Sequence, residues 1–382
     1  MIKRSLAHLI KTRLKNYPAV ALLGARQSGK TTLARTFSEV YFDLELEQDK
    51  LGLDLQLDDL VRSKVPVILD EAQNFPEIFP RIRAAIDSDR KRNGRFLILG
   101  SVSPGLMREV SEFLTGRVAL VELLPLSLLE LPKQPIDDFW LMGGFPDGGI
   151  LKGGQYLQWQ KNYLDLLAMR DLPVWGLQAA APVIKRFFKM IAACQGLLWN
   201  ASMIAKSMGL SYHTVNSYLD FLEQAFLIRK LAPYAANIRK RLIRSPKVYW
   251  RDSGLLHALM NVNSAEELIA QPWVGVSWEG WVIEQILAAL NNRGVSCDSF
   301  FFRTSDGYEL DLVLRIKGKL WAFEIKLTTS PGKRDLDRLK KTAAMIGADR
   351  SVLVSKSNRT IQGQDAVITG IKGVLKLMSD LQ

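Results

Sequence analysis

Residues near the start of the chain have the types and spacing that bind a nucleotide phosphate. Gly24-Ala25-Arg26-Gln27-Ser28-Gly29-Lys30-Thr31 matches the pattern G-x-x-x-x-G-K-[ST], after an apolar run at 20–23 and before a helical segment at 30–37. Glycines let consecutive backbone N–H groups turn toward phosphate oxygens, and the dipole of the following helix favours negative charge. Lys30 would reach the β- and γ-phosphates, and the Thr31 hydroxyl would ligate Mg²⁺. We expect this loop, together with Thr32, to bind ATP and Mg²⁺.

Two adjacent carboxylates come directly after the next apolar run, at 67–69. Asp70 stands where a ligand that orders Mg²⁺ is expected, and Glu71 stands where a base would polarise the attacking water. A third apolar run, at 96–99, leads through Gly100 to Ser101, whose hydroxyl could contact the γ-phosphate or the lytic water. The three segments together predict ATP hydrolysis.

A second set of chemistry-bearing residues is dispersed over the last third of the chain. Glu279 lies on a predicted helix, Asp311 on a predicted strand, and Glu324 and Lys326 on the strand after it. Because side chains alternate along a strand, Glu324 and Lys326 share one face, where Asp311 and Glu279 could meet them. Glu284 would replace Glu279 if the helix were turned differently.

Three carboxylates and a lysine in one cleft suit a divalent cation. Carboxylate oxygens are hard ligands, so Mg²⁺ or Mn²⁺ is the metal expected at Glu279, Asp311 and Glu324. Lys326 could position or deprotonate an attacking water while the metal offsets the charge that develops on a phosphate. This ordered set therefore predicts a site of nuclease type.

The middle of the chain predicts a helix-turn-helix. Residues 200–208 have the pattern of a first helix, and Ser211 that of the N-cap of a second one. The second helix carries Tyr212, His213 and Asn216, which could enter the major groove of DNA. The alternative is that this module serves packing alone.

The charge balance favours an anionic partner. The 382 residues include 51 Lys and Arg against 39 Asp and Glu, which gives a formal net charge of +12 and an isoelectric point near 9.6. Basic residues concentrate in one window at 1–38 and in another at 229–251. The second window predicts a DNA-binding patch made of Arg239, Lys240, Arg241 and Arg244. The alternative for any basic run is a solvated surface.

Composition excludes several other classes of protein. With 48% apolar and 24% charged residues, the chain is neither wholly disordered nor collagen-like. Its two cysteines cannot form a disulfide framework or, by themselves, a structural zinc site. The apolar runs are too short to cross a membrane and the N-terminus lacks a signal-peptide core, so we expect a cytoplasmic protein without a membrane partner.

Apolar runs and helical periodicity divide the chain into three expected domains. Four short apolar runs with helical segments between them predict an α/β sheet with right-handed crossovers over 1–132. Helical periodicity dominates 155–228, within a helical and winged-helix-like domain placed at 133–246. Strand patterns return in a third, α/β domain placed at 247–382.

These segments together resemble the AAA+ ATPases, and most closely a prokaryotic group in which an AAA+ core precedes a poorly characterised C-terminal domain. The matching segments span nearly the whole chain: Leu69-Asp70-Glu71-Ala72-Gln73, Leu99-Gly100-Ser101, Leu114-Thr115-Gly116-Arg117, Leu124-Pro125-Leu126-Ser127, Gly143-Gly144-Phe145-Pro146 and Arg170-Asp171-Leu172. The resemblance implies that Ser101 is at the sensor-1 position, where AAA+ proteins more often have Asn. It also implies a homo-oligomer in which Arg117 is an arginine finger, acting in its own chain or on a neighbour.

The C-terminal set resembles the PD-(D/E)xK restriction-endonuclease-like fold, with Glu279 on the first helix, Asp311 as the acidic residue and Glu324-Ile325-Lys326 as the E-x-K. The preferred prediction is an ATP-hydrolysing AAA+ protein that acts on nucleic acid through a Mg²⁺- or Mn²⁺-dependent nuclease-like domain, which ATP repositions on DNA. One alternative is an ATP-dependent switch or scaffold that binds DNA or a protein partner without cleavage. A third alternative omits nucleic acid and senses a protein partner.

Overall fold

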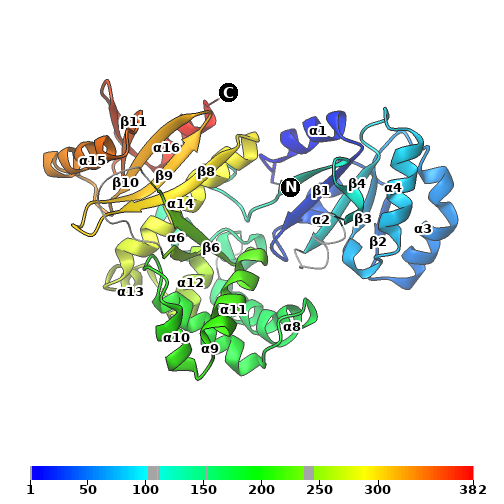
Figure 1. Ribbon diagram of the computed structural model, residues 1–382, viewed down its shortest axis with the longest axis horizontal. Helices are drawn as coiled ribbons and strands as arrows, with labels where there is room; N and C mark the ends of the chain where they lie inside the picture. The colour runs from blue at the N-terminus through cyan, green and yellow to red at the C-terminus, as the bar shows by residue number, and fades with distance from the viewer. Residues whose placement is uncertain (1, 102–109, 111, 152–153, 236–244, 382) are drawn as a thin grey trace.

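The computed structural model describes residues 2–101, 110, 112–151, 154–235 and 245–381, with Ser101 described by its backbone alone. Within these residues, two β-sheets of five and eight strands organise the chain (Figure 1). The smaller sheet and its helices, blue to cyan, form the N-terminal domain. The larger sheet lies at the other side of the view, and the green helices of the middle region lie below it. The predicted α/β fold is confirmed.

The N-terminal sheet is parallel throughout, in the order β2-β3-β4-β1-β5. Its strands are β1 (Ala19–Gly24), β2 (Tyr41–Asp43), β3 (Val67–Asp70), β4 (Phe96–Ser101) and β5 (Val118–Glu122). The carboxyl ends of parallel strands meet at one edge of the sheet. Gly24, Asp70 and Ser101 each end a strand, so the sheet brings these three positions to the same edge.

Helices cover both faces of this sheet (Figure 1). Ala21 and Leu23 of β1 pack on the side of α3 (Glu47–Leu60) and α4 (Ile78–Ser88). Val20 and Leu22, which point the other way, pack with α1 (Ala7–Asn16) and α2 (Lys30–Ala34). Burial on both faces explains why β1 appears in the sequence as an unbroken apolar run. It also makes β1 a rigid support for the loop that follows it.

The middle region is helical, as the periodicity over 155–228 predicts. Its helices are α6 (Ile136–Met142), α7 (Tyr156–Leu166), α8 (Leu172–Val174), α9 (Ala181–Ala193), α10 (Ala201–Met208) and α11 (Tyr212–Gln224). The side chain of Asn200 accepts from Met203 N–H at the start of α10, and that of Ser211 accepts from Thr214 N–H at the start of α11. Local capping thus fixes where these two helices begin.

The larger sheet is mixed, in the order β12-β13-β11-β10-β9-β8-β6-β7. Its strands are β6 (Ile228–Pro233), β7 (Lys247–Trp250), β8 (Cys297–Arg303), β9 (Glu309–Ile316), β10 (Lys319–Ile325), β11 (Arg350–Ser355), β12 (Ile361–Gln362) and β13 (Ala366–Gly370). The helices around it are α12 (Ser253–Leu259), α13 (Ala265–Ile269), α14 (Val274–Arg293), α15 (Lys333–Met345) and α16 (Ile371–Ser379).

Strands on both sides of residue 246 belong to this one sheet. β6 pairs antiparallel with β7 and parallel with β8, where Ala232 lies opposite Phe300. β6 precedes the domain boundary expected at 246, and the strands that it pairs with, β7 and β8, follow it. Arg229 and Lys230, the first residues of the basic window at 229–251, lie in this strand.

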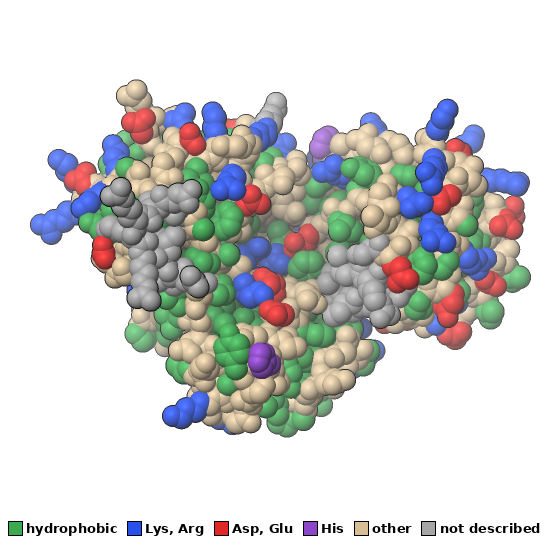
Figure 2. Space-filling model, in the orientation of Figure 1, with side chains coloured by type: hydrophobic (Ala, Val, Ile, Leu, Met, Phe, Trp, Pro, Cys, Tyr) green, Lys and Arg blue, Asp and Glu red, His purple; other side chains and the backbone are tan. Residues whose placement is uncertain are grey.

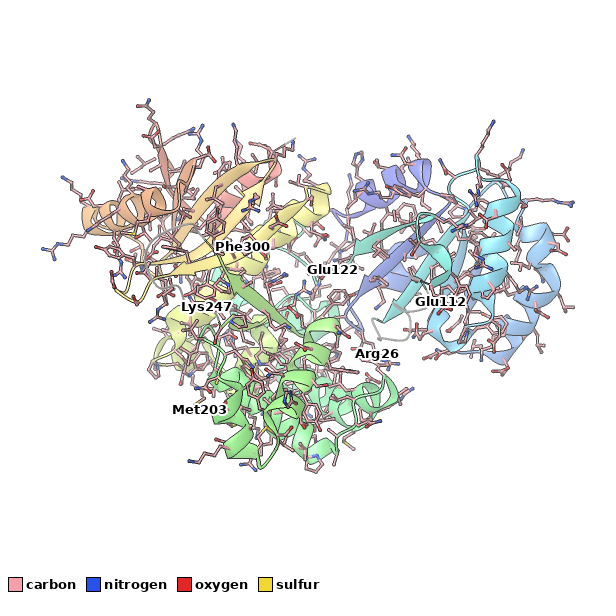
Figure 3. All side chains as sticks on the ribbon, viewed as in Figure 1. Arg26, Glu112, Glu122, Met203, Lys247 and Phe300 are labelled. Atoms are coloured by element: carbon pink, nitrogen blue, oxygen red, sulfur yellow. The ribbon has the colours of Figure 1, made fainter. Side chains whose placement is uncertain are left out.

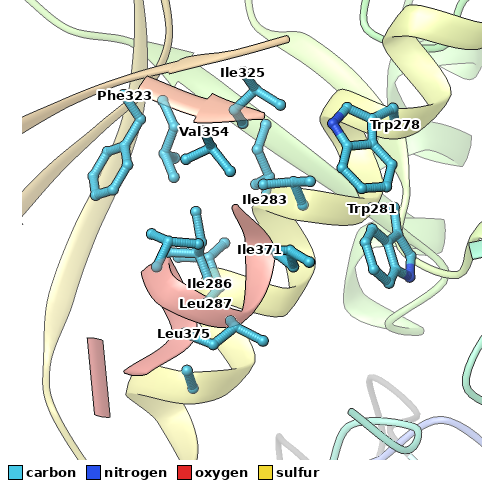
Figure 4. Close-up of a cluster of buried hydrophobic side chains, with 14 of the residues drawn as sticks. Trp278, Trp281, Ile283, Ile286, Leu287, Phe323, Ile325, Val354, Ile371 and Leu375 are labelled. Carbon is cyan, nitrogen blue, oxygen red and sulfur yellow. The ribbon is translucent and has the colours of Figure 1, made fainter. Parts of the chain in front are cut away.

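Helix α14 runs through the C-terminal core and is buried on almost all sides. Ile283 and Ile286 contribute to one apolar cluster with Phe323 of β10, Val354 of β11 and residues of α16 (Figure 4). A helix buried all round shows little amphipathic pattern, and any charge on it must find a partner inside the protein. No described helix combines the length and the apolar character that a membrane span requires.

His257 of α12 lies in a buried contact between α6, α12 and α14. Its Nδ1 is 2.9 Å from Leu141 O and its Nε2 is 2.7 Å from Ser277 Oγ, which also accepts from Trp140 Nε1 at 3.1 Å. Since Leu141 O can only accept, Nδ1 carries the proton and Nε2 accepts from the Ser277 hydroxyl. Burial lowers the pKa of His257 to about 4.

We expect acid to destabilise the wild-type protein more than a His257→Gln variant. The unfolded chain binds a proton at the ordinary pKa of 6.5 but the folded chain only near 4, so stability is lost as the pH falls between these values. At about pH 5 the loss through this group is about 2 kcal/mol. Urea unfolding followed by tryptophan fluorescence at neutral and acidic pH measures it. An equal pH dependence in the two proteins would contradict it.

Candidate functional site

The loop after β1 has the backbone that a phosphate site requires. A Cβ on Gly24 would lie 2.3 Å from Leu123 O, so the close approach of β5 admits only glycine there. Gly29 has φ +94 and Gln27 has φ +61, both in the left-handed region. Gln27 is a non-glycine residue in that region, and such strain is typical of functional loops.

Lys30 is buried beneath this loop. Its Nζ donates to Gly24 O and Ala25 O, both at 3.0 Å. Burial lowers the pKa of Lys30 to about 8, although the carboxylates of Glu71 and Asp70 oppose the change. Among the residues that the structure describes, the hydrogen-bond acceptors of this ammonium are neutral carbonyls, and phosphate oxygens would be stronger ones.

Asp70, at the end of β3, lies beside Thr31. The Thr31 hydroxyl donates to Asp70 Oδ2 at 2.6 Å, and Tyr41 OH donates to the same oxygen at 2.9 Å. A threonine hydroxyl next to a carboxylate, at the edge where the phosphate loop begins, is a donor set that suits Mg²⁺ bound to a nucleotide. The residues thus fit the expected ion. Tyr41 was not predicted, because a single tyrosine on a short strand gives no sequence signal.

Glu71 directly follows Asp70 in an unusual backbone conformation. Its φ is +48, and its N–H donates to Asp70 Oδ1 at 3.0 Å. The Gln73 amide donates to the Glu71 carboxylate. The Gln73 amide contacts the Glu71 carboxylate and the Thr31 hydroxyl contacts the Asp70 carboxylate, so the two adjacent carboxylates have different partners.

The middle region contacts the phosphate loop directly. Arg26 Nη1 donates to Asp171 Oδ1 at 2.5 Å, and Tyr163 OH donates to Arg26 O at 3.1 Å. Burial raises the pKa of Asp171, while the charge of Arg26 opposes that change. Figure 3 shows Arg26 at the junction of the N-terminal domain and the middle region. Asp171 belongs to the segment Arg170-Asp171-Leu172, which the sequence marked without giving it a role.

Arg4 ties the N-terminal segment to the same loop. Its guanidinium donates to Ser28 O at 2.8 Å, to Leu124 O at 2.6 Å and to Glu130 Oε1 at 2.9 Å. The phosphate loop is thus held to the segment after β5 by a side chain that precedes α1. Part of the basic N-terminal window has this structural purpose.

The remaining two residues predicted for the ATPase site have different outcomes. The side chain of Ser101 lies outside the described residues, so its role stays a prediction. Arg117 precedes β5, and Val118 lies opposite Ala19 at the start of β1, which is the edge of the sheet away from the phosphate loop. The two edges are about 15–20 Å apart at ~3.3 Å per residue. Arg117 cannot act within its own chain.

Arg117 is instead paired with Asp87 of the neighbouring α4 segment, with Nε and Nη2 each 2.9 Å from a carboxylate oxygen. Its action on a neighbouring subunit stays a prediction, and that action would require this pair to open.

The predicted C-terminal set does come together. Asp311 of β9 lies across from the end of β10, where its Oδ2 accepts from Ile325 N–H at 2.7 Å. Lys326 Nζ is 2.6 Å from Glu324 Oε1. Burial and the negative charges of Glu279 and Glu324 raise the pKa of Asp311 well above its usual value. Burial also raises the pKa of Glu324, against the effect of Lys326.

A lysine that the sequence analysis missed lies among these carboxylates. Lys247 Nζ is 3.0 Å from Glu279 Oε1 and 2.8 Å from Glu309 Oε1, and Tyr249 OH donates to the same Glu279 oxygen at 2.5 Å. Burial disfavours the ammonium, but Glu279, Asp311 and Glu309 outweigh it and raise the pKa of Lys247. Lys247 is the first residue of β7, at one edge of the larger sheet (Figure 3).

The predicted metal set does not fit this arrangement. Among the residues that the structure describes, no group of three or more His, Cys, Asp and Glu side chains is placed so that it could hold a metal ion. Glu279, expected as a metal ligand with Asp311 and Glu324, uses its oxygen for Lys247 and Tyr249. The expectation of Mg²⁺ or Mn²⁺ at these three carboxylates is not supported by this geometry.

Glu284 cannot replace Glu279, because it belongs to a separate ion-pair network. Arg229 Nη2 donates to Glu284 Oε2 at 3.0 Å and Arg251 Nε donates to it at 3.2 Å. Although burial acts in the opposite direction, these charges hold the pKa of Glu284 below its usual value. Arg251 Nη2 also reaches Glu122 Oε1, at 2.5 Å. Figure 3 shows Glu122 on the side of the N-terminal domain that faces the larger sheet.

The predicted DNA-binding residues of α11 divide into two kinds. Tyr212 and His213 are exposed, whereas Asn216 is half-buried and its Oδ1 accepts from Trp199 Nε1 at 2.9 Å. Asn216 thus contributes to packing of the helices. Arg239, Lys240, Arg241 and Arg244 lie outside the described residues. Figure 2 shows basic side chains spread among acidic ones on this face rather than gathered in one field.

Three family models match the chain in succession. Residues 16–131 match an AAA domain, residues 133–266 a domain of unknown function (DUF8612) and residues 274–373 another domain of unknown function (DUF4143). Uncharacterized proteins of Mycobacterium tuberculosis and Mycobacterium bovis are each 37% identical over 334 residues, covering 86% of this chain and 75% of theirs. The chain belongs to their family of AAA-domain proteins.

More distant likenesses extend over similar lengths. An uncharacterized protein of Haemophilus influenzae is 24% identical over 358 residues, covering 83% of this chain and 84% of its own. The solved structure of a Walker-type ATPase of Pyrococcus abyssi covers 68% of this chain and 96% of its own, at 16% identity and a TM-score of 0.47. The AAA match contains the loop around Lys30 and the Asp70-Glu71 pair, so the N-terminal domain is an ATP-binding domain of AAA type.

We expect Lys30→Ala to lower ATP turnover by about 100-fold or more, because it removes the buried charge beneath the phosphate loop. Phosphate release measures turnover, and binding of a fluorescent ATP analogue measures affinity. Lys64→Ala, an exposed lysine of the same domain, is the matched control. Full turnover in Lys30→Ala would contradict the assignment of the site.

Proposed function

We propose that this protein is an ATP-hydrolysing switch in which the phosphate loop controls the middle region and, through it, the larger sheet. The contact between Arg26 of the loop and Asp171 of the middle region carries the proposal. The hydrogen bond from Tyr163 to Arg26 O supports it, because the same loop residue is then held by two side chains from outside the N-terminal domain.

Each residue of the site has a defined task in this proposal. Lys30 exchanges the carbonyls of Gly24 and Ala25 for the β- and γ-phosphate oxygens. Thr31 and Asp70 hold Mg²⁺, which when bound offsets the charge of the phosphates. Glu71, held by Gln73, accepts a proton from the attacking water.

Arg26 gives the site a means of signalling. Its guanidinium lies on the phosphate loop, and a bound polyphosphate competes with Asp171 for it. The side chain of Asp171 is only 6% exposed, so an Asp171 without Arg26 is a buried carboxylate that has lost its ion pair. The π-helical segment Leu167–Asp171 lies between α7 and α8. A shift of this segment and of the two helices would expose Asp171 to water and so relieve the cost of burying its charge.

We expect Asp171→Asn to tighten ATP binding by about fivefold or more, because Arg26 is then free for the phosphates. The Arg26→Ala/Asp171→Asn double variant should lose this gain. Asp165→Asn is the matched control, because it removes an exposed ion pair between Asp165 of α7 and Lys185 of α9. Calorimetric titration with a non-hydrolysable ATP analogue measures the affinities. Unchanged affinity in Asp171→Asn would contradict competition for Arg26.

The proposed target of the switch is DNA, bound without cleavage. Exposed Tyr212 and His213 at the start of α11 and the net charge of +12 support this target. The second candidate is a metal-dependent nuclease, favoured by the meeting of Asp311, Glu324 and Lys326 on one face of the sheet. Against it, the Lys247 ammonium contacts one of the two Glu279 oxygens that a metal could use and adds a positive charge there.

We expect DNA binding that weakens with salt, and weakens further when Arg239, Lys240, Arg241 and Arg244 are replaced by Ala. Each lost phosphate contact makes the negative slope of log K against log salt shallower by about 0.9. Fluorescence anisotropy with labelled DNA measures this, and ATP binding by the same variant should stay unchanged.

Two outcomes would oppose that expectation. Absence of DNA and RNA binding at low salt would favour a protein partner. Cleavage of linear, circular or branched DNA with Mn²⁺, if abolished by Asp311→Asn and by Lys326→Ala, would establish the nuclease instead.

A further inference from the structure

The carboxylate cluster of the larger sheet already contains a cation of its own. The side chain of Lys247 is 4% exposed, and its ammonium bridges Glu279 on α14 and Glu309 on β9. A buried ammonium is costly unless it is paired. Two carboxylates within 3.0 Å, with the charge of Asp311 nearby, provide that pairing.

Each carboxylate of the cluster has a partner within the protein. Glu279 and Glu309 share Lys247, Glu324 pairs with Lys326, and Asp311 accepts from the backbone N–H of Ile325. Tyr249 OH occupies a further lone pair of Glu279. At Glu279 Oε1, Glu324 Oε1 and Asp311 Oδ2, a divalent cation would have to compete with donors of the chain.

The backbone fixes Lys247 in this place. On one side β7 pairs with β6, with Leu231 opposite Lys247. On the other side the segment before α10 contacts it, through a bridge at Leu198, a bond from Gly196 N–H to Val248 O and one from Trp199 N–H to Pro246 O. Strand β7 is thus held from both sides, and its ammonium cannot leave the carboxylates by a simple loop movement.

We propose that Lys247 is the resident counter-ion of this cluster and takes the place of a divalent cation there. The wild-type cluster then binds neither Mg²⁺ nor Mn²⁺, and removal of the ammonium creates a site for such an ion. The ATP-driven switch and this role of Lys247 can fail separately, because they depend on different residues and on different measurements.

The test is Mn²⁺ binding by the nucleotide-free full-length protein, with free Mn²⁺ counted by electron paramagnetic resonance. Lys247→Met removes the ammonium at similar volume. Lys247→Met/Glu309→Gln also removes one carboxylate, which keeps the charge balance and leaves Glu279, Asp311 and Glu324. Lys247→Arg is the matched control that keeps the positive charge. Asp311→Asn, added to each protein, shows whether a bound ion lies in the cluster, and circular dichroism reports folding.

We expect the Lys247→Met/Glu309→Gln protein to bind Mn²⁺ at least about tenfold more tightly than wild type or Lys247→Arg, with a rise in Tm on addition of Mn²⁺. Asp311→Asn should abolish the gain. The proposal is overturned if wild type binds Mn²⁺ and Asp311→Asn removes that binding. It is equally overturned if the folded double variant gains no Mn²⁺ binding.

Discussion

The guanidinium of Arg251 joins the two sheets of the molecule. Arg251 directly follows β7 in the chain. Its guanidinium contacts Glu122 at the end of β5 on one side and Glu284 of α14 on the other. Its side chain is 9% exposed, as is expected of a charge that is stable only while both carboxylates stay in place. The buried charge of Arg251 therefore helps to fix how the N-terminal domain lies relative to the larger sheet and helix α14.

Two other buried cations show how surroundings decide what a lysine can do. Lys30 lies against neutral carbonyls, so burial dominates and lowers its pKa to about 8. Lys247 lies against carboxylates, so attraction dominates and raises its pKa. The first ammonium is bound weakly enough to move to a phosphate, whereas the second is saturated by its own chain. The same residue type thus serves ligand binding at one site and internal charge balance at the other.

Most of the N-terminal domain follows from the sequence because its signals are local. An apolar run buried on both faces predicts a parallel strand, and G-x-x-x-x-G-K-[ST] at its end predicts the loop that places Lys30 and Thr31. The Ser211 cap at the start of α11 is equally local. The pairing of β6 with β8 joins segments far apart in the chain, and no pattern in either segment predicts that they pair. For that reason the expected boundary at 246 did not anticipate that β6 belongs to the same sheet as β8.

By itself the sequence determined the phosphate loop, the Asp70-Glu71 pair and the meeting of Asp311 with Glu324 and Lys326, because motif spacing and strand alternation place these residues. Only the tertiary structure decided which partners their charges have. In the folded chain, Arg117 lies at the edge of the sheet away from the phosphate loop. Glu284 pairs with Arg229 and Arg251, and Lys247 pairs with Glu279. Each of these contacts joins separate elements of the fold, and a charge is attracted by its neighbours in space, whatever their distance along the chain.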